Sequence, residues 1–586
     1  MTKLALDELD ELTAQARARR RAAHGQRLTY RLAGDDALEA LTDRVSAAEL
    51  ARPDRPDRPV TVVLDGGAPL EVQLHAAAAA HAAHGMVQAV EVGGGGAAAA
   101  RAAALARLAR PDAVHVIGDG LAGAAAGADD LGVVKADELA ALEAAAAELG
   151  VVLAERLAVF PEWATGLAWA PEERRFDVLD RSDAEGLARD HDGAWFSGAD
   201  AEPPRLLPRA GHAPAGSAVG EVLAGVLAGQ EVGEAEIVRL FAARGPELAA
   251  VCEVADQLRR DSVGDEVTWV SNRNINYTNV CTFKCRFCGF SKGPLSLNLR
   301  GAPYLLTLDD IAERVREAAE RGATEVCLQG GIHPDFDGDY YIDVARAVKT
   351  AAPDIHVHGF TALEVTEGAK RLGEPLADDL RRLIDAGLRS LPGTAAEILD
   401  DEIRAVICPD KIDTDEWLDC HRTAHSVGLR SNVTIMFGSV EQPVHWARHI
   451  VRTRALQKET GGFTEFVPLP FVHMASPIYL QRRSRRGPTF RESLLMHAVG
   501  RIAYRGWIDN IQASWVKLGL GGVRQCLHAG VNDLGGTLIN ENISRAAGAS
   551  HGQELNEADF RALVEGEGRT LAQRTTLYGR VAALSS

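Results

Sequence analysis

Three closely spaced cysteines constrain this chain more than any other feature of its sequence. They stand in the run Cys281-Thr-Phe-Lys-Cys285-Arg-Phe-Cys288, which is a CxxxCxxC spacing. Three thiolates on one short loop can hold three irons of a cubic [4Fe–4S] cluster and leave the fourth iron without a protein ligand. A closed zinc site or a [2Fe–2S] cluster would need a fourth protein ligand, and the neighbouring sequence offers none. The remaining alternative is three free cysteines that pack as small apolar side chains.

Length, charge and cysteine usage limit the class of protein. The chain has 586 residues, more than one hydrophobic core usually holds, so we expect two or three domains. Its net charge of -19 argues against a nucleic-acid partner and favours small molecules. The eight cysteines form no secreted disulfide framework, and cluster thiolates need a reducing compartment, so we expect a cytoplasmic protein. We expect no membrane association, because the sequence has neither a signal-peptide core nor an apolar run of roughly 18 residues.

The N-terminal part changes composition twice. Residues 1–59 read as a polar, helical segment that ends in a proline-rich linker, 52–59. Residues 60–200 alternate strands and helices, which predicts a small α/β domain of unknown role, with strands at 60–64, 87–92 and 113–117. The run Gly93-Gly-Gly-Gly96 could form a phosphate loop, but it lacks the GxGxxG spacing of a dinucleotide site. Residues 201–216 read as a second linker.

The rest of the chain reads as one larger α/β domain. A helical lead-in at 217–266 precedes a barrel at 267–560, which includes a C-terminal cap, and a tail follows at 561–586. Strands are expected at 267–276, 325–329, 355–360, 388–391, 430–436 and 465–467, with amphipathic helices between them, for example at 308–321 and 415–427. About six such units predict a partial (β/α)6 TIM-type barrel, in which chemistry gathers at the C-terminal ends of the strands.

Glycines and a carboxylate stand at two of those strand ends. Gly330 and Gly331 follow the second strand at once, and two glycines let backbone polar groups approach a ligand's amino group closely. An ordinary turn would suit them as well. Glu364 follows the third strand, three residues after Thr361. Its carboxylate could accept hydrogen bonds from a ribose or a substrate, or could simply be the first-turn acid of the next helix.

Histidines and the remaining cysteines give weaker signals. His333, His358 and His473 lie at or near strand ends and are candidate acids or bases, although a lone histidine is usually structural. The cysteines at 327, 408, 420 and 526 are too isolated in the sequence to hold an auxiliary cluster, so we expect them in the core.

The cysteine spacing, with Phe287 directly before the last cysteine, resembles the signature of the radical S-adenosylmethionine (SAM) superfamily. The resemblance implies that the open iron binds the amino and carboxylate groups of SAM, and that the reduced cluster cleaves SAM to a 5′-deoxyadenosyl radical. The residues implied for these roles are Cys281, Cys285 and Cys288 as metal ligands, Phe287 beside the cluster, Gly330 and Gly331 at the SAM amino group, Thr361 and Glu364 at its ribose, and Gly438 at its adenine. Glu364 and His333 are the expected catalytic residues.

Longer phrases between residues 217 and 560 resemble one family of this superfamily, the CofH half of FO synthase, which contributes to a deazaflavin coenzyme. The phrases are Asn272-Arg-Asn-Ile-Asn-Tyr-Thr-Asn-Val-Cys281, Leu328-Gln-Gly-Gly-Ile-His-Pro334, Leu391-Pro-Gly-Thr-Ala-Ala-Glu397, Phe466-Val-Pro-Leu-Pro-Phe471, Arg486-Gly-Pro-Thr-Phe490 and Asn532-Asp-Leu-Gly-Gly-Thr-Leu538. The resemblance implies a transferase that joins the 4-hydroxybenzyl group of L-tyrosine to 5-amino-6-(D-ribitylamino)uracil and releases 2-iminoacetate. Candidate substrate contacts are Asn532, Asp533, Asn540 and Glu541, whose alternative is turn and cap chemistry.

The N-terminal part departs from the bifunctional FO synthases, which carry a second radical SAM half with its own three cysteines. Only Cys252 precedes Cys281 here. We therefore expect a separate CofG-type radical SAM cyclase as partner, together with an electron donor. One alternative is a radical SAM enzyme of the futalosine route to menaquinone, which shares the cysteine loop and the Gly-Gly turn. A more remote alternative is a non-enzymatic iron–sulfur protein that binds a partner.

Overall fold

The computed structural model describes residues 172–189, 192–207, 217–293 and 301–581, together with the backbone of short strands before residue 156. The chain divides into two compact units. One comprises residues 1–189, 212–224 and 242–247, and the other comprises residues 190–211, 225–241 and 248–586.

Parallel strands make up the first unit. One sheet has the order β2-β3-β4-β5 and another has the order β6-β1-β7. The strands are β1 (Arg27–Leu32), β2 (Asp43–Ser46), β3 (Val60–Leu64), β4 (Val87–Val92), β5 (Val116–Ile117), β6 (Asp130–Val134) and β7 (Val152–Glu155), and the described helix is α6 (Glu172–Arg181).

The predicted strands at 60–64 and 87–92 are confirmed, and the third is limited to β5. The prediction of a helical segment at 1–59 is wrong where β1 and β2 lie. In β1, apolar residues at 28, 30 and 32 alternate with polar ones, which is a strand period that the helical interpretation overlooked. The glycine run at 93–96, the proline-rich linker at 52–59 and most of the linker at 201–216 lie outside the described residues.

The second unit is built on a six-stranded parallel sheet with the order β14-β13-β12-β11-β10-β9. Its strands follow one another along the chain, as expected for repeated β/α units, and the partial barrel is confirmed. The strands are β9 (Asn272–Ile275), β10 (Glu325–Leu328), β11 (His356–Gly359), β12 (Leu388–Leu391), β13 (Arg430–Phe437) and β14 (Phe463–Pro470).

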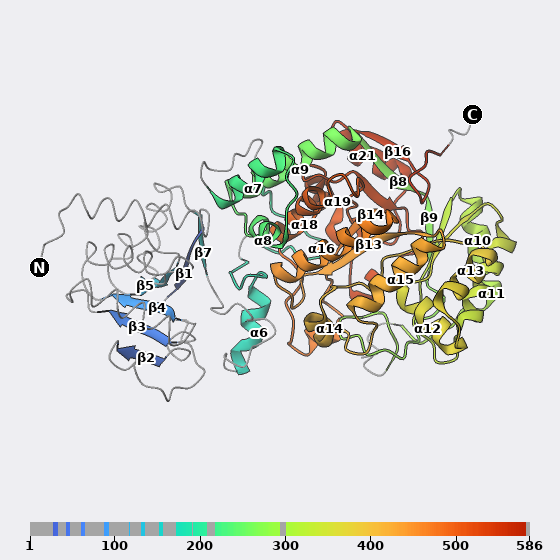
Figure 1. The fold of residues 1–586 in the computed structure, drawn as a ribbon, viewed down its shortest axis with the longest axis horizontal. Coiled ribbons are helices and arrows are strands. Elements are labelled where there is room, and N and C mark those ends of the chain that lie inside the picture. The colour runs from blue at the N-terminus through green and yellow to red at the C-terminus, as the bar shows by residue number, and fades with distance from the viewer. Residues whose placement is uncertain are drawn as a thin grey trace, which may run out of the picture. The chain divides into compact units, whose positions relative to one another are not determined.

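Helices lie outside these strands (Figure 1). They are α10 (Leu308–Glu320), α11 (Gly338–Ala351), α12 (Ala362–Leu372), α13 (Leu376–Ala386), α14 (Asp401–Ile407), α15 (Thr414–Ser426) and α16 (Pro443–Thr460). The helices predicted at 308–321 and 415–427 are confirmed as α10 and α15. Each begins with a capping box, in which the side chains of Thr307 and Asp413 accept N–H groups of the first turn.

The stretch predicted as one strand, 267–276, is two strands. Its first part, β8 (Glu266–Val270), leaves the barrel sheet and pairs with β15 (Asp533–Gly536) on one side and β16 (Thr570–Gln573) on the other. Residues 561–581 are therefore part of the fold and not a tail, because β16 covers an edge of β8 in parallel register, with Leu571 beside Val267.

The remaining helices precede or follow the barrel strands. They are α7 (Ala218–Leu227), α8 (Glu234–Phe241), α9 (Pro246–Val263), α17 (Pro477–Leu480), α18 (Phe490–Ala503), α19 (Trp515–Leu527), α20 (Ile543–Ala547) and α21 (Glu557–Gly566). The helical lead-in before the barrel is thus confirmed as α7 to α9. Among the described residues, no helix has the length and apolar character that crossing a membrane requires.

Candidate active site

The cysteine loop follows β9 and is fastened to three other segments of the barrel. The backbone N–H of Thr282 donates to the carbonyl of Ile332 at 3.0 Å, and that of Arg286 donates to Ile407 at 2.8 Å. The carbonyl of Arg286 in turn accepts the N–H of Ile478 at 2.7 Å. The loop is therefore held by backbone bonds, so the three thiols have fixed positions at the C-terminal edge of the sheet.

The three thiols are half-buried, and their surroundings suit a metal cluster. Burial raises the pKa of Cys281 and of Cys285, while the ammonium of Lys411 beside Cys285 acts in the opposite direction. The Sγ of Cys288 accepts the N–H of Ser291 at 3.3 Å. A positive side chain and an N–H donor both stabilise the negative charge that thiolate ligands carry.

Lys411 is fixed behind this loop. Its Nζ lies 2.5 Å from the carboxylate of Glu397 and 5.7 Å from the ring centre of Phe287, so the predicted neighbour of the cluster packs on a buried cation. Cys408, which we expected to be isolated, lies close enough to Cys285 for their charges to interact. Cys408 is buried, burial raises its pKa to about 11, and it lies outside the three-thiol loop. The donor set thus fits a cluster with three protein ligands.

The Gly-Gly turn lies directly against the cysteine loop. A Cβ atom on Gly331 would stand 2.2 Å from the carbonyl oxygen of Val280 and 3.0 Å from the Cβ of Cys281. The N–H of Gly331 donates to Thr278 at 2.9 Å, and the N–H of Gly330 donates to Glu364 at 3.0 Å. Both N–H groups already donate within the protein. The carbonyl oxygens of Gly330 and Gly331 are the backbone groups that could accept a ligand's amino group.

Glu364 has a different surrounding from the one we expected. Its side chain is fully buried, and its carboxylate accepts the hydroxyl of Tyr277, the N–H of Gly330 and, at 2.6 Å, the N–H of Thr361. In return, the N–H of Glu364 donates to the hydroxyl oxygen of Thr361, which completes the capping box of α12. Burial raises the pKa of Glu364, and these donors oppose the rise. The carboxylate therefore organises the glycine turn, and both of its oxygens accept protein donors, while its contact with SAM or a substrate stays a prediction.

Tyr277 was not singled out from the sequence. It is fully buried, and its ring fills the space where a Cβ atom on Gly330 would lie, 2.4 Å from that position. The phrase Asn274-Ile-Asn-Tyr277 contained it, but nothing in that phrase indicated a partner 87 residues away.

Position 438 needs a glycine, because of its backbone conformation and its close neighbours. Its φ is +102°, and a Cβ atom there would lie 2.1 Å from Pro488 Cδ. The turn after it wraps the buried carboxylate of Glu441, which accepts the N–H groups of Gly438, Ser439 and Val440. Any contact to a ligand at this turn would use the backbone or apolar atoms, because the one acid is already bonded.

His333 stays apart from the other predicted residues. Its ring stacks on Phe336 at 4.7 Å, and its Nδ1 accepts the N–H of Asp335 at 3.2 Å. His358 instead faces the barrel interior, where its Nδ1 lies 2.7 Å from the hydroxyl of Ser390. The geometry gives His333 no contact with Glu364, the other residue expected to be catalytic.

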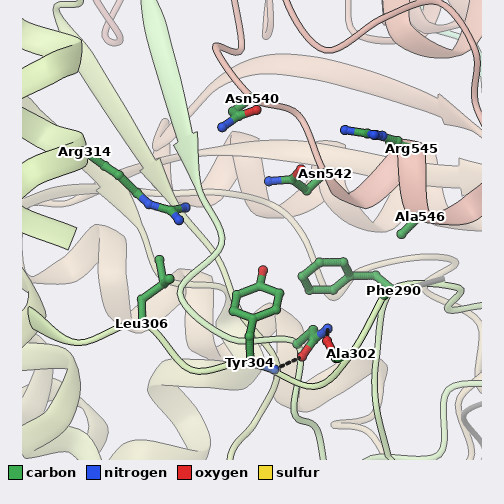
Figure 2. Close-up of a pocket in the computed structure, with 11 residues that line it drawn as sticks. Phe290, Ala302, Tyr304, Leu306, Arg314, Asn540, Asn542, Arg545 and Ala546 are labelled. Atoms are coloured by element: carbon green, nitrogen blue, oxygen red, sulfur yellow. Dashed lines mark hydrogen bonds between the residues drawn. The ribbon is translucent and has the colours of Figure 1, made fainter. Parts of the chain in front are cut away.

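Two cavities lie on either side of the segment 538–546. The first, called the mouth pocket here, has a volume of about 800 Å³. Figure 2 shows Asn540, Asn542 and Arg545 on one side of it, with Phe290 and Tyr304 opposite. The pocket thus adjoins the cysteine loop through Phe290, two residues after Cys288.

The second cavity, called the chamber here, lies inside the barrel and has a volume of about 260 Å³. Its wall is strongly polar, and its lining residues include Asn272, Asn274, Glu325, His358, Asn432, Glu465, Lys517, Glu541 and Arg574. Alternate residues of 538–546 face the two cavities, since Glu541 and Ser544 line the chamber while Asn540 and Asn542 line the mouth pocket. Of the four predicted substrate contacts, Asn540 and Glu541 therefore lie in the walls of these two cavities, and Asn532 lines a third cavity.

The other two predicted contacts, Asn532 and Asp533, bond to protein groups. Asn532 Oδ1 accepts Arg501 at 2.7 Å and the N–H of Ile511 at 2.9 Å. Asp533 is fully buried and accepts Arg574 at 2.5 Å. Both side chains are thus held by other protein groups, and their assignment as substrate contacts stays a prediction.

Comparison with known proteins agrees with this geometry. A model of the Radical SAM superfamily matches residues 275–450, and a model of the CofH/MqnC C-terminal region matches residues 460–575. A 5-amino-6-(D-ribitylamino)uracil–L-tyrosine 4-hydroxyphenyl transferase from Methanopyrus kandleri is 48% identical over 328 residues, which cover 56% of this chain and 88% of that protein. The chain belongs to this transferase family.

The chain also resembles longer proteins. An FO synthase from Nocardia farcinica is 51% identical over 346 residues, or 59% of this chain and 40% of that protein. The chain therefore spans less than half the length of the FO synthases that it matches. Among solved structures, methylornithine synthase is similar with a TM-score of 0.47 at 17% identity, over 60% of this chain and 97% of that one.

Proposed function

We propose that this chain joins the 4-hydroxybenzyl group of L-tyrosine to 5-amino-6-(D-ribitylamino)uracil. The observation that carries the proposal is the match to the Methanopyrus transferase, which extends over 88% of that protein. The two family models place the cysteine loop and the glycine turn within 275–450 and the segment 538–546 within 460–575. The fixed three-thiol loop supports it independently, because such a loop suits a cluster with an open iron.

In this proposal Cys281, Cys285 and Cys288 hold a [4Fe–4S] cluster, and the carbonyl groups of Gly330 and Gly331 accept the amino group of SAM. When bound, the cluster and SAM supply a 5′-deoxyadenosyl radical. Lys411 balances cluster charge, and Glu364 fixes the glycine turn through Gly330. Phe287 and the turn at Gly438 shape the cluster and adenine sides of the site.

The reaction proposed at this site removes a hydrogen atom from the tyrosine amino group. The 5′-deoxyadenosyl radical would take this hydrogen atom and become 5′-deoxyadenosine. The Cα–Cβ bond would then break, 2-iminoacetate would leave, and the 4-hydroxybenzyl radical would add to the pyrimidine ring. The adduct radical would give up one electron, which balances the electron that cleaves SAM, and one proton. The protein's contribution is to orient both substrates and exclude water, since the radical would react with any nearby donor.

The two cavities differ in a way that suits two substrates. The chamber is small and is lined largely by polar side chains, which fits an amino acid. The mouth pocket is three times as large and combines amide groups, from Asn279, Asn540 and Asn542, with the rings of Phe290 and Tyr304. Amides can bond uracil and ribityl groups while the rings cover the heterocycle, so we place the diaminouracil there.

We also propose a separate CofG-type cyclase and an electron donor as partners, in the reducing cytoplasm. The proposal about the cyclase rests on the single cysteine that precedes the cluster loop. It is contradicted if the pure protein alone forms FO from tyrosine and the diaminouracil.

The test is anaerobic. The cluster is reconstituted and reduced, SAM, tyrosine and the diaminouracil are added, and 5′-deoxyadenosine and the adduct are followed by mass spectrometry. We expect both products, with deoxyadenosine dependent on tyrosine. A cluster that never cleaves SAM would overturn the proposal and favour the non-enzymatic alternative.

One second function has a specific observation behind it. The family model that matches residues 460–575 describes CofH and MqnC together, so the futalosine-route alternative shares this region. Deoxyadenosine without the hydroxybenzyl adduct, followed by turnover of a futalosine-type substrate, would decide for that alternative.

A further inference from the structure

One lysine faces the chamber without a negative partner. Lys517 lies near the start of α19, and its Nζ donates to the hydroxyl of Ser544 at 2.8 Å. Among the residues that the structure describes, this neutral hydroxyl is the one hydrogen-bond partner of the ammonium, and no carboxylate lies within ion-pair distance of it. A buried or half-buried charge without a counter-charge is costly, so its persistence needs an explanation.

The nearest acid does not supply the counter-charge. The carboxylate of Glu541 accepts the N–H groups of Ile543 and Ser544, at 3.0 and 2.9 Å, and also that of Arg545. Glu541 thereby fixes the first turn of α20, and with it the hydroxyl that Lys517 contacts. Through Ser544, Glu541 fixes the position of the Lys517 ammonium. The side of the ammonium that faces the chamber stays open.

The other cation of the chamber is already neutralised. Arg574 bonds Asp533 at 2.5 Å and Glu465 at 3.3 Å, so two acids surround it. Burial lowers the pKa of Lys517, and the charge of Glu541 partly offsets this shift. Lys517 is therefore the chamber group best placed to gain from an arriving anion, whose charge would favour the ammonium form.

We propose that Lys517 binds the α-carboxylate of the amino-acid substrate in the chamber. The inference rests on the proposed function, because that function requires an amino acid with a free carboxylate next to the radical source. The ammonium would hold the carboxylate against the wall formed by Ser544, which leaves the amino group and the side chain to point toward the other chamber residues. Lys517 is thus a substrate-binding residue and takes no part in bond breaking.

The experiment compares tyrosine with tyramine, which lacks the carboxylate. Binding of each compound to the cluster-loaded, unreduced protein with SAM is measured by equilibrium dialysis, for the wild type, Lys517→Met, Lys517→Arg and Lys370→Met. Lys370 lies on the exposed face of α12 and serves as the matched control. SAM binding is measured on the same samples.

We expect the wild type to bind tyrosine about 10- to 100-fold more tightly than tyramine, the range for one charge-assisted contact. Lys517→Met should bind both compounds equally weakly, Lys517→Arg should keep most of the preference, and Lys370→Met should match the wild type. SAM binding should be unchanged in all four proteins.

Three outcomes would overturn the inference while the proposed function stands. These are unchanged tyrosine binding in Lys517→Met, equal affinity of the wild type for tyrosine and tyramine, and a loss confined to SAM binding. A wild type that does not bind tyrosine, and that forms no adduct in the anaerobic assay above, would instead contradict the proposed function itself.

Discussion

The buried hydroxyl of Tyr277 donates a hydrogen bond to the buried carboxylate of Glu364. The same carboxylate accepts the N–H of Gly330, so one contact joins the strand before the cysteine loop to the glycine turn beside it. The position of the turn relative to the cluster therefore depends on two side chains that need not touch any ligand.

Replacing Glu364 with Gln should test this dependence. The amide has one oxygen where the carboxylate has two, so one of the N–H groups of Gly330 and Thr361 loses its acceptor. An unsatisfied buried donor costs about 1–3 kcal/mol, and we expect a loss of stability of that size together with weaker SAM binding. Urea denaturation and SAM titration measure the two effects.

Glu367→Gln is the control for this prediction. Glu367 lies one turn further along α12 and makes only long ion pairs, 3.6 Å from Lys370 and 3.8 Å from Arg371. It should change stability by less than about 0.5 kcal/mol. Equal behaviour of the two variants would show that the carboxylate of Glu364 does not organise the turn.

Gly331→Ala should loosen the cluster. The added Cβ would stand 2.2 Å from the carbonyl oxygen of Val280, which is backbone of the cysteine loop, so the loop must shift. We expect a lower iron content after reconstitution and faster loss of iron to a chelator. Gly566→Ala, where nothing lies within 4 Å of the new atom, should load like the wild type. A fully loaded Gly331→Ala protein would contradict the close packing described for this turn.

Most of the features that the sequence predicts come from residues only a few positions apart. The cysteine loop, the glycine turn and the strands of the barrel are short patterns whose meaning lies within a few residues. The sequence does not reveal the contact of Glu364 with Tyr277 or the pairing of β16 with β8, because the two partners in each case are remote in sequence. Lys517 gave no signal, since a single charge in the apolar run Trp515-Val-Lys517-Leu says nothing of an unpaired ammonium.

Arg574→Met should destabilise the barrel strongly. The guanidinium bonds Asp533 and Glu465, and both acids are buried. Removing the shared cation leaves two like charges uncompensated, which typically costs about 3–5 kcal/mol. Thermal unfolding followed by circular dichroism measures the loss. Arg580→Met is the control, because Arg580 is 83% exposed in its pair with Glu266 and should contribute almost nothing.

Asp379 predicts a pH-dependent change in stability. Its side chain is fully buried on α13, both carboxylate oxygens lack a hydrogen-bond partner among the described residues, and the guanidinium of Arg382 is 3.9 Å away. Burial raises its pKa to about 6, although Arg382 opposes the rise. The folded protein therefore binds this proton more tightly than the unfolded chain, whose aspartate pKa is about 3.9. The resulting penalty on the folded state grows as the pH rises from about 4 to 6, and it is constant above that range.

Asp379→Asn removes this penalty because the amide has no charge to bury. We expect the variant to be more stable than the wild type by up to about 3 kcal/mol at pH 8, and by about half as much at pH 5. Urea midpoints at the two pH values measure the difference, and Asp378→Asn, at an exposed position paired with Arg381, is the control. A gain that is equal at both pH values would mean that the amide acts through packing or hydrogen bonding. A loss of stability at pH 8 would mean that the carboxylate is stabilised where it lies, and that the charge of Arg382 outweighs the burial.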